Sequence, residues 1–346
     1  EYAVSHGGQY AAYYLGCLLL DRSRWQEAQA LWERCAENIA LPTVWRNLAL
    51  IYYNKLHNAP RACKAMQTAF AMDKTDARVF FELDQLDKTT NAPYAERLAR
   101  MQENAALLPQ RDDLYTEYIT LLNLDGQYQK AYDCIMGHNF HPWEGGEGKI
   151  PAQYRLALMG LARAADDDTA LALLQQALTY PHNLGEGKLI GNLDNDLYEM
   201  IGELYAKRGD TARAEEAFRL AARGNFDLTG AMYYNDQPPQ MMYYAAKALA
   251  ALGETDEAKK RFAAFIDYAE THRDDVMEIE YFAVSLPDFL IFEGDLNKNN
   301  RVHCCLMEAL GALGLGDNER ARQAALRGLA ENSCQSELNR IVKGIL

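Results

Sequence analysis

The stretch that decides the fold is Leu197-Tyr-Glu-Met-Ile-Gly-Glu-Leu-Tyr-Ala-Lys-Arg-Gly-Asp-Thr-Ala-Arg-Ala-Glu-Glu-Ala-Phe-Arg-Leu-Ala-Ala222. Small residues allow two helices to cross closely, and large residues fill the gaps between neighbouring helix pairs. The stretch alternates the two kinds at the spacing of a packed helical hairpin. Eight positions agree with one repeat template: Tyr198, Ile201, Gly202, Tyr205, Gly209, Ala214, Phe218 and Ala221.

The same order of small and large residues recurs along the chain. Upstream, one copy contains Leu15, Gly16, Trp25, Ala28 and Trp32, and the next contains Trp45, Leu48, Ala49, Tyr52, Ala62, Met66 and Ala69. A weaker copy covers about 76–106, and others fall near 115–131, 151–180, 241–266 and 302–331. An internal repeat of this kind predicts a solenoid in which each hairpin packs on its neighbours.

This pattern resembles the tetratricopeptide repeat (TPR) family. The resemblance implies an all-α fold, an α-solenoid of about eight helical hairpins in a right-handed superhelix, with long inter-repeat loops. It also implies a concave side that is lined by the first helix of each pair and holds ligands. We expect one continuous superhelix in two parts, with N-terminal hairpins at 1–136 and hairpins carrying long inserts at 137–346.

Composition limits the partners. The chain has 346 residues, 49% of them hydrophobic, and no apolar run of 18 residues that could span a bilayer. Its formal net charge of −14 repels nucleic acid and anionic lipid. We therefore expect a soluble, cytoplasmic protein without a nucleic-acid or membrane partner. The chain opens at Glu1 already in a helical pattern, so we interpret it as a segment of a longer protein.

Cysteine and histidine patterns indicate no metal or cofactor. The seven cysteines show no C-x-x-C spacing, and most fall where a helix would bury a small side chain. His138 and His141 lie in a glycine-rich loop without a third ligand at a recognisable spacing. We therefore expect reduced core thiols, no metal and no cofactor.

Four inserts interrupt the repeat, and inserts between repeats form loops that frequently lie on the binding face. They cover 138–149, 180–196, 226–239 and 267–301. The first two both contain Gly-Glu-Gly-Lys, at 146–149 and at 185–188, which suggests one structural device used twice. Two interpretations stay open for this tetrapeptide: a loop that wraps a ligand, or an ordered loop whose charged residues pair with each other or cap the next helix.

The inserts also support a narrower resemblance, to the TPR region of bacterial proteins that carry an N-terminal galactose-mutarotase-like β-sandwich of unknown function. It rests on the strings Pro142-Trp-Glu-Gly-Gly-Glu-Gly-Lys149, Tyr180-Pro-His-Asn-Leu-Gly-Glu-Gly-Lys188 and Ser285-Leu-Pro-Asp-Phe-Leu-Ile-Phe-Glu-Gly-Asp-Leu296. It implies a carbohydrate context, and it makes the missing sandwich domain a candidate partner.

Aromatic rings beside planar polar groups suit a polyhydroxylated ligand. The positions of the first helices that should face inward are acidic, such as Asp196, Glu199 and Glu203, and they equally suit a neutral or basic peptide. We expect binding residues in the loops and at their edges: His141, Trp143, Glu144, Glu147, Lys149, Glu186, Lys188, Asp196, Tyr234, Asn235, Asp236, Tyr281, Asp288 and Arg301.

The function predicted from these features is a non-catalytic binding or scaffold module for a protein, a peptide or a carbohydrate. The alternative is a helical lobe of a carbohydrate-active, glycosidase-like enzyme. Such an enzyme needs two carboxylates about 5 to 10 Å apart as acid and base, and the acidic loop residues could supply them.

Overall fold

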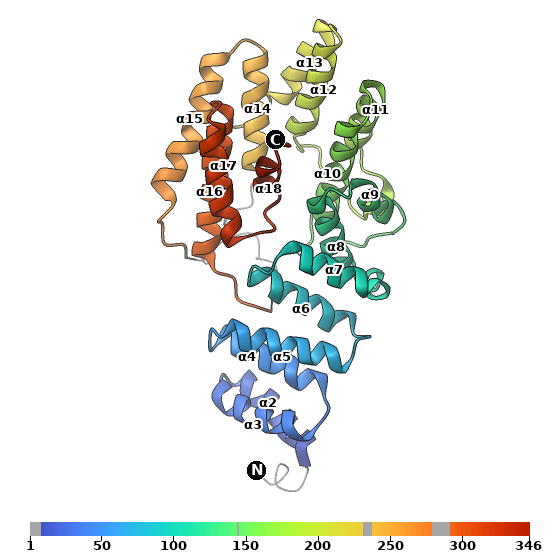
Figure 1. Ribbon diagram of the computed structural model, residues 1–346, viewed down its shortest axis with the longest axis vertical. Helices are drawn as coiled ribbons and strands as arrows, with labels where there is room; N and C mark the ends of the chain where they lie inside the picture. The colour runs from blue at the N-terminus through green and yellow to red at the C-terminus, as the bar shows by residue number, and fades with distance from the viewer. Residues whose placement is uncertain (1–7, 144, 231–236, 279–290) are drawn as a thin grey trace. The chain divides into compact units, whose positions relative to one another are not determined.

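The computed structural model describes residues 8–143, 145–230, 237–278 and 291–346 (Figure 1). Within these ranges all regular secondary structure is helical and no strand occurs, so the predicted all-α fold is confirmed. None of the described helices combines the length and the apolar character that a membrane span requires.

In the described part of the chain the helices follow one another as eight consecutive pairs and one short final helix, in agreement with the predicted number of hairpins. In chain order they are α2 (Gly8–Asp21), α3 (Trp25–Asn38), α4 (Pro42–Asn54), α5 (Ala59–Met72), α6 (Ala77–Thr89), α7 (Tyr94–Glu103), α8 (Asp112–Asp125), α9 (Tyr128–Met136), α10 (Lys149–Ala164), α11 (Asp167–Ala177), α12 (Asn195–Lys207), α13 (Thr211–Ala221), α14 (Pro239–Ala251), α15 (Thr255–His272), α16 (Leu296–Gly314), α17 (Asn318–Glu331) and α18 (Ser336–Val342). Two 3₁₀ turns, η1 (Ala105–Gln110) and η2 (His182–Leu184), join them.

The described residues divide into two compact units. The first unit contains 8–92, 99–115 and 291–294, and the second contains the described parts of 93–98, 116–278 and 295–346. The expected division at 136/137 and the continuous superhelix stay predictions.

Glycines at the helix crossings hold the pairs together. A Cβ atom on Gly202 of α12 would lie 2.6 Å from the Phe218 ring of α13, and one on Gly16 of α2 would overlap the Trp32 ring of α3. Trp32 is fully buried, and its indole nitrogen donates to the Tyr13 carbonyl at 3.1 Å. The small–large alternation in the sequence therefore marks the contact surface within each pair, as predicted.

A residue in the left-handed region marks the turn inside most pairs, where the chain reverses between two helices. The first three pairs use non-glycine residues there and four later pairs use glycine: Ser23, His57, Asn91, Gly126, Gly209, Gly253 and Gly316. Glycine adopts this conformation without steric cost, and asparagine tolerates it better than most residues. The turn geometry is thus conserved between pairs while the residue changes.

The last helices are longer than the repeat pattern indicates. α15 continues to His272 and α16 begins at Leu296, so the fourth insert is shorter than the predicted 267–301. Asp295 caps α16 by accepting from the Lys298 N–H at 2.9 Å, a favourable start that lies outside the repeat template. In the first unit, Phe292 of this insert is buried against the Tyr53 ring on α4, 5.5 Å between centroids.

Candidate functional site

The first two inserts lie against each other in the second unit. The Phe140 N–H donates to the Asn183 carbonyl at 2.9 Å, and the Asn183 amide returns bonds to the Ile135 and His138 carbonyls at 2.7 and 2.9 Å. The Gly148 N–H donates to the Glu186 carboxylate at 2.8 Å. The two Gly-Glu-Gly-Lys strings therefore meet, one contributing the helix N-terminus and the other the carboxylate.

The two strings differ in conformation, so the expectation of one device used twice is wrong. In the first string the third residue, Gly148, has positive φ and caps α10, whereas in the second string the first residue, Gly185, has positive φ after η2. A Cβ atom on Gly185 would overlap the Phe140 carbonyl, which explains why this position requires glycine. The strings interlock as complementary parts.

Lys188 of the second string joins a buried charge network. Its ammonium donates to the Asp194 carboxylate at 2.5 Å and to the Leu178 carbonyl at 2.7 Å. Arg155 of α10 lies between Asp194, at 3.7 Å, and Asp196, to which it donates directly. Burial would lower the pKa of Arg155, but the two carboxylates outweigh it and raise that pKa. These groups connect α10 to the start of α12.

The third insert packs on the same unit. Phe226 lies edge-on to the Phe265 ring of α15 at 5.4 Å, and His303 of α16 lies 2.9 Å from the Thr229 carbonyl. Gln237, near the end of this insert, lies 3.5 Å from the Asn195 side chain. The described ends of this insert are thus anchored to helices on both sides.

The remaining predicted site residues are dispersed. Trp143 covers Gly146 within its own loop, Lys149 begins α10, and His141 and Glu147 are exposed. Arg301 belongs to α16, where it pairs with Glu331 of α17 at 2.6 Å. Six residues lie outside the described ranges: Glu144, Tyr234, Asn235, Asp236, Tyr281 and Asp288. The binding roles of all these residues stay predictions.

A groove of about 440 Å³ lies elsewhere in the second unit and is lined by α10, α11, α12 and α14. Its apolar lining includes Met200, Leu204 and Leu174, and its charged lining includes Glu199, Glu203 and Lys247. Further lining comes from Ala162, Arg163, Ala165, Asp167, Ala170, Lys207, Tyr244, Ile345 and Leu346. Glu199 and Glu203 are the inward positions expected from the repeat register.

Two carboxylates share one ammonium in this groove. The Lys247 ammonium lies 2.5 Å from Glu199 and 3.2 Å from Glu203, one helical turn further along α12. Glu199 is 2% exposed. Burial raises its pKa to about 7; Lys247 opposes this shift and the charge of Glu203 adds to it. Near neutral pH this pair of carboxylates therefore gains or loses a proton.

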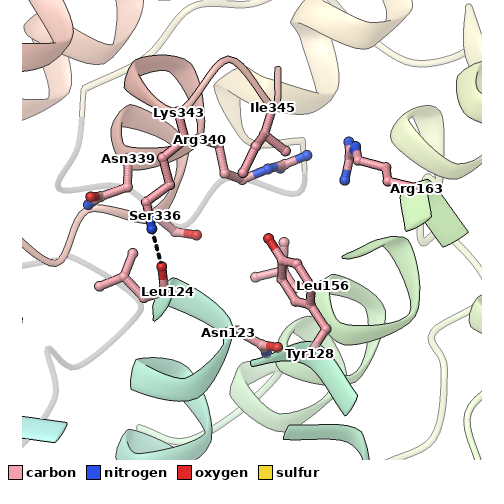
Figure 2. A pocket seen from close by; sticks show the side chains of 10 residues that line it. All are labelled: Asn123, Leu124, Tyr128, Leu156, Arg163, Ser336, Asn339, Arg340, Lys343 and Ile345. Carbon is pink, nitrogen blue, oxygen red and sulfur yellow. Dashed lines mark hydrogen bonds between the residues drawn. The ribbon is translucent and has the colours of Figure 1, made fainter. Parts of the chain in front are cut away.

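A smaller cavity of about 20 Å³ adjoins the groove and shares Arg163 and Ile345 with it (Figure 2). Its cations come from two distant segments, Arg163 on α10 and Arg340 and Lys343 at α18. The cavity is otherwise lined by Asn123, Leu124, Tyr128, Leu156, Ser336 and Asn339. Figure 2 shows the two guanidinium groups facing each other across the cavity.

Hydrogen bonds fix two of these cations in place. Arg340 is buried, donates to Glu337 at 2.7 Å and donates to the Tyr244 hydroxyl at 3.1 Å. Lys343 donates to the Leu124 carbonyl at 2.5 Å. These bonds attach α18 to α8 and to α14. Sequence reasoning missed this arrangement because α18 belongs to none of the repeat copies.

In the described part of the chain, no group of three or more histidine, cysteine, aspartate or glutamate side chains could hold a metal ion. All seven cysteines are free thiols, and Cys35, Cys304 and Cys305 are buried.

No family model matches the sequence. A chain of the Naa15/Naa10 complex bound to HypK-THB is 16% identical over 96% of this chain, with a TM-score of 0.43, and this chain spans 49% of its length. The C-terminal part of a TPR repeat-containing protein from Cytophaga hutchinsonii is 13% identical, covering 96% of this chain and 99% of its own, with a TM-score of 0.25. The TPR domain of P58(IPK) is 11% identical, covering 97% and 98%, with a TM-score of 0.29. At these identities and scores the likeness transfers no partner or activity to this chain.

Proposed function

We propose that the second unit is a binding module whose groove on α10, α11, α12 and α14 holds an extended segment of a partner protein. The observation that supports this proposal is the groove itself. Its volume of about 440 Å³ falls within the range of roughly 300–1,000 Å³ that is usual for ligand pockets. Glu199 and Glu203, which line it, are positions that the repeat register predicts to face inward.

The lining favours a peptide. The apolar part comes from aliphatic side chains and from Met200, a flexible side chain that adapts to different partners. Charged groups of both signs surround it, with Lys247 next to Glu203 and Lys207 next to Asp167. An extended peptide presents apolar side chains, charged side chains and backbone amides together, so it can use all of these contacts.

The other ligands and the enzymatic activity that the sequence suggests depend on residues outside this groove. A carbohydrate ligand and a β-sandwich domain as partner depend on the predicted loop residues, six of which lie outside the described ranges, including Tyr234 and Asp236. Both stay predictions. For the glycosidase-like alternative, the described residues provide no supporting observation, and Glu186 is already occupied by the Gly148 N–H.

Selection of peptides from a random library on the immobilised protein tests the proposal. Peptides that are enriched should bind the wild-type protein and lose at least tenfold in affinity with Leu204→Glu, which places a charge in the apolar lining. The matched control is Leu326→Glu, because Leu326 is a 42% exposed leucine on α17 outside the groove. Equal affinity for the wild type and Leu204→Glu would refute the groove as the binding site, and so would failure to enrich any peptide.

A further inference from the structure

The small cavity next to the groove concentrates positive charge. Arg163, Arg340 and Lys343 all line it, and among the residues that the structure describes no acidic one does. The only carboxylate paired with any of the three in the described residues is Glu337, which binds Arg340. This cluster occurs in a chain whose formal net charge is −14.

Arg163 is the informative member of the cluster. Within the described residues the Arg163 guanidinium donates to the Met200 sulfur at 3.8 Å, a weak acceptor, and it forms no ion pair there. Desolvation lowers the pKa of Arg163, and the facing Arg340 lowers it further. The Arg163 side chain is exposed, so a ligand can reach its guanidinium, which faces that of the buried Arg340.

Such an arrangement costs stability in the absence of a ligand. Like charges that face each other repel, and water screens the repulsion less on the side of Arg340, which is buried. Sites that are kept unfavourable for stability are typical of binding surfaces. An anion between the two guanidinium groups would convert the repulsion into two charge-assisted hydrogen bonds.

We propose that this cavity binds the anionic oxygens of an acidic or phosphorylated side chain, carried by the peptide that occupies the adjoining groove. The proposal rests on the proposed function and specifies its ligand. The cavity of about 20 Å³ has room for about one or two water-sized groups, which suits the oxygens of such a side chain and not its bulk. Because the cavity shares Arg163 and Ile345 with the groove, a bound peptide can reach both.

Sodium acetate and sodium phosphate serve as probes, each compared with sodium chloride at equal ionic strength, with thermal unfolding of the whole chain as the readout. The test variant is Arg163→Gln, and the control is Arg322→Gln, which removes an exposed arginine outside both cavities. Without added anion, Arg163→Gln should unfold at a higher temperature than the wild type, because the repulsion from Arg340 is gone.

A bound anion should raise the unfolding temperature of the wild type and of Arg322→Gln by about 2–4 °C, and should not raise that of Arg163→Gln. A response to acetate assigns the site to carboxylates, and a response to phosphate alone assigns it to phosphorylated side chains. Equal responses in the wild type and Arg163→Gln would overturn the proposal. So would a destabilised Arg163→Gln variant.

The peptide selection separates this inference from the proposed function. The selected peptides are amidated at the C-terminus, and their acidic side chains are replaced one at a time by the corresponding amide. At one position this replacement should weaken binding to the wild-type protein at least fivefold, and Arg163→Gln should abolish that difference. Peptides that require Leu204 but not Arg163 would leave the groove in place and refute the anion site.

Discussion

Replacement of Glu199 by glutamine should change the way in which stability depends on pH. Glu199 is 2% exposed, and its carboxylate shares the Lys247 ammonium with Glu203, whose side chain is 58% exposed. Burial raises the pKa of Glu199 to about 7 from an ordinary value of 4.5, and it outweighs the opposing effect of Lys247. The pKa of Lys247 is raised as well, because both carboxylates favour its charged form.

These two shifts point in opposite directions for the Glu199–Lys247 pair, since one disfavours and the other favours full ionisation. Lys247 contacts Glu203 as well as Glu199, and of the two carboxylates it is the buried Glu199 whose pKa is raised, so Glu199 takes the proton. Between pH 4.5 and about 7 the folded state therefore keeps a proton that the unfolded state has lost. The stabilising contribution of protonated Glu199 to the free energy of unfolding is fully present below pH 4.5 and is lost as the pH rises through this window.

The shift corresponds to about 3 kcal/mol at most, and the nearby ammonium reduces it, so we expect about 1–3 kcal/mol. Urea unfolding followed by far-UV circular dichroism, at about pH 5 and about pH 8, measures the difference. Relative to the wild type, Glu199→Gln should gain stability by this amount on going from the lower to the higher pH. Glu215→Gln, an exposed residue of α13, is the control and should show no such gain. If the free energies of unfolding of the wild type and Glu199→Gln differ by the same amount at both pH values, Glu199 is not protonated in the folded state and the reasoning is refuted.

Two further predictions concern packing. Gly311→Ala would place a Cβ atom 2.5 Å from the Phe262 backbone carbonyl, so we expect the free energy of unfolding in urea to fall by about 1–3 kcal/mol. The control is Gly187→Ala, which has no atom within 4 Å of the added Cβ and should change that free energy by less than about 0.5 kcal/mol. Glu186→Ala should cost about 1 kcal/mol because it removes the acceptor at the N-terminus of α10, while Glu147→Ala in the other string should have little effect; equal losses would mean that the strings do not interlock.

The local contacts of the fold were predictable because the residues that make them lie close together in the chain. Gly202 and Phe218 lie on the two helices of one hairpin, and so do Gly16 and Trp32. The small and large size of these residues alone identifies the point where the helices cross. The first three pairs have Ser23, His57 and Asn91 at the left-handed position of the turn, so a turn glycine does not identify them. The packing residues of their helices identify them instead.

The candidate site was less predictable because it combines segments that no repeat links. The inward positions of Glu199 and Glu203 followed from the register, and both line the groove. The cations did not follow from it, since Arg163 on α10 and Arg340 on α18 lie far apart in the sequence and α18 belongs to no repeat copy. No spacing within a single helix indicates such a meeting.

The two Gly-Glu-Gly-Lys strings and the proposed ligand surface, the groove with its adjoining cavity, are thus different parts of the molecule. In the glycine-rich strings, Glu186 already accepts from the Gly148 N–H and Lys188 already donates to Asp194, which is the expected state of a loop that fixes two helices. Arg163 instead remains without a carboxylate among the described residues and faces another cation. A charge that the fold leaves unbalanced is better evidence for a ligand than a charge that the fold has already paired, because only the former gains free energy when a partner arrives.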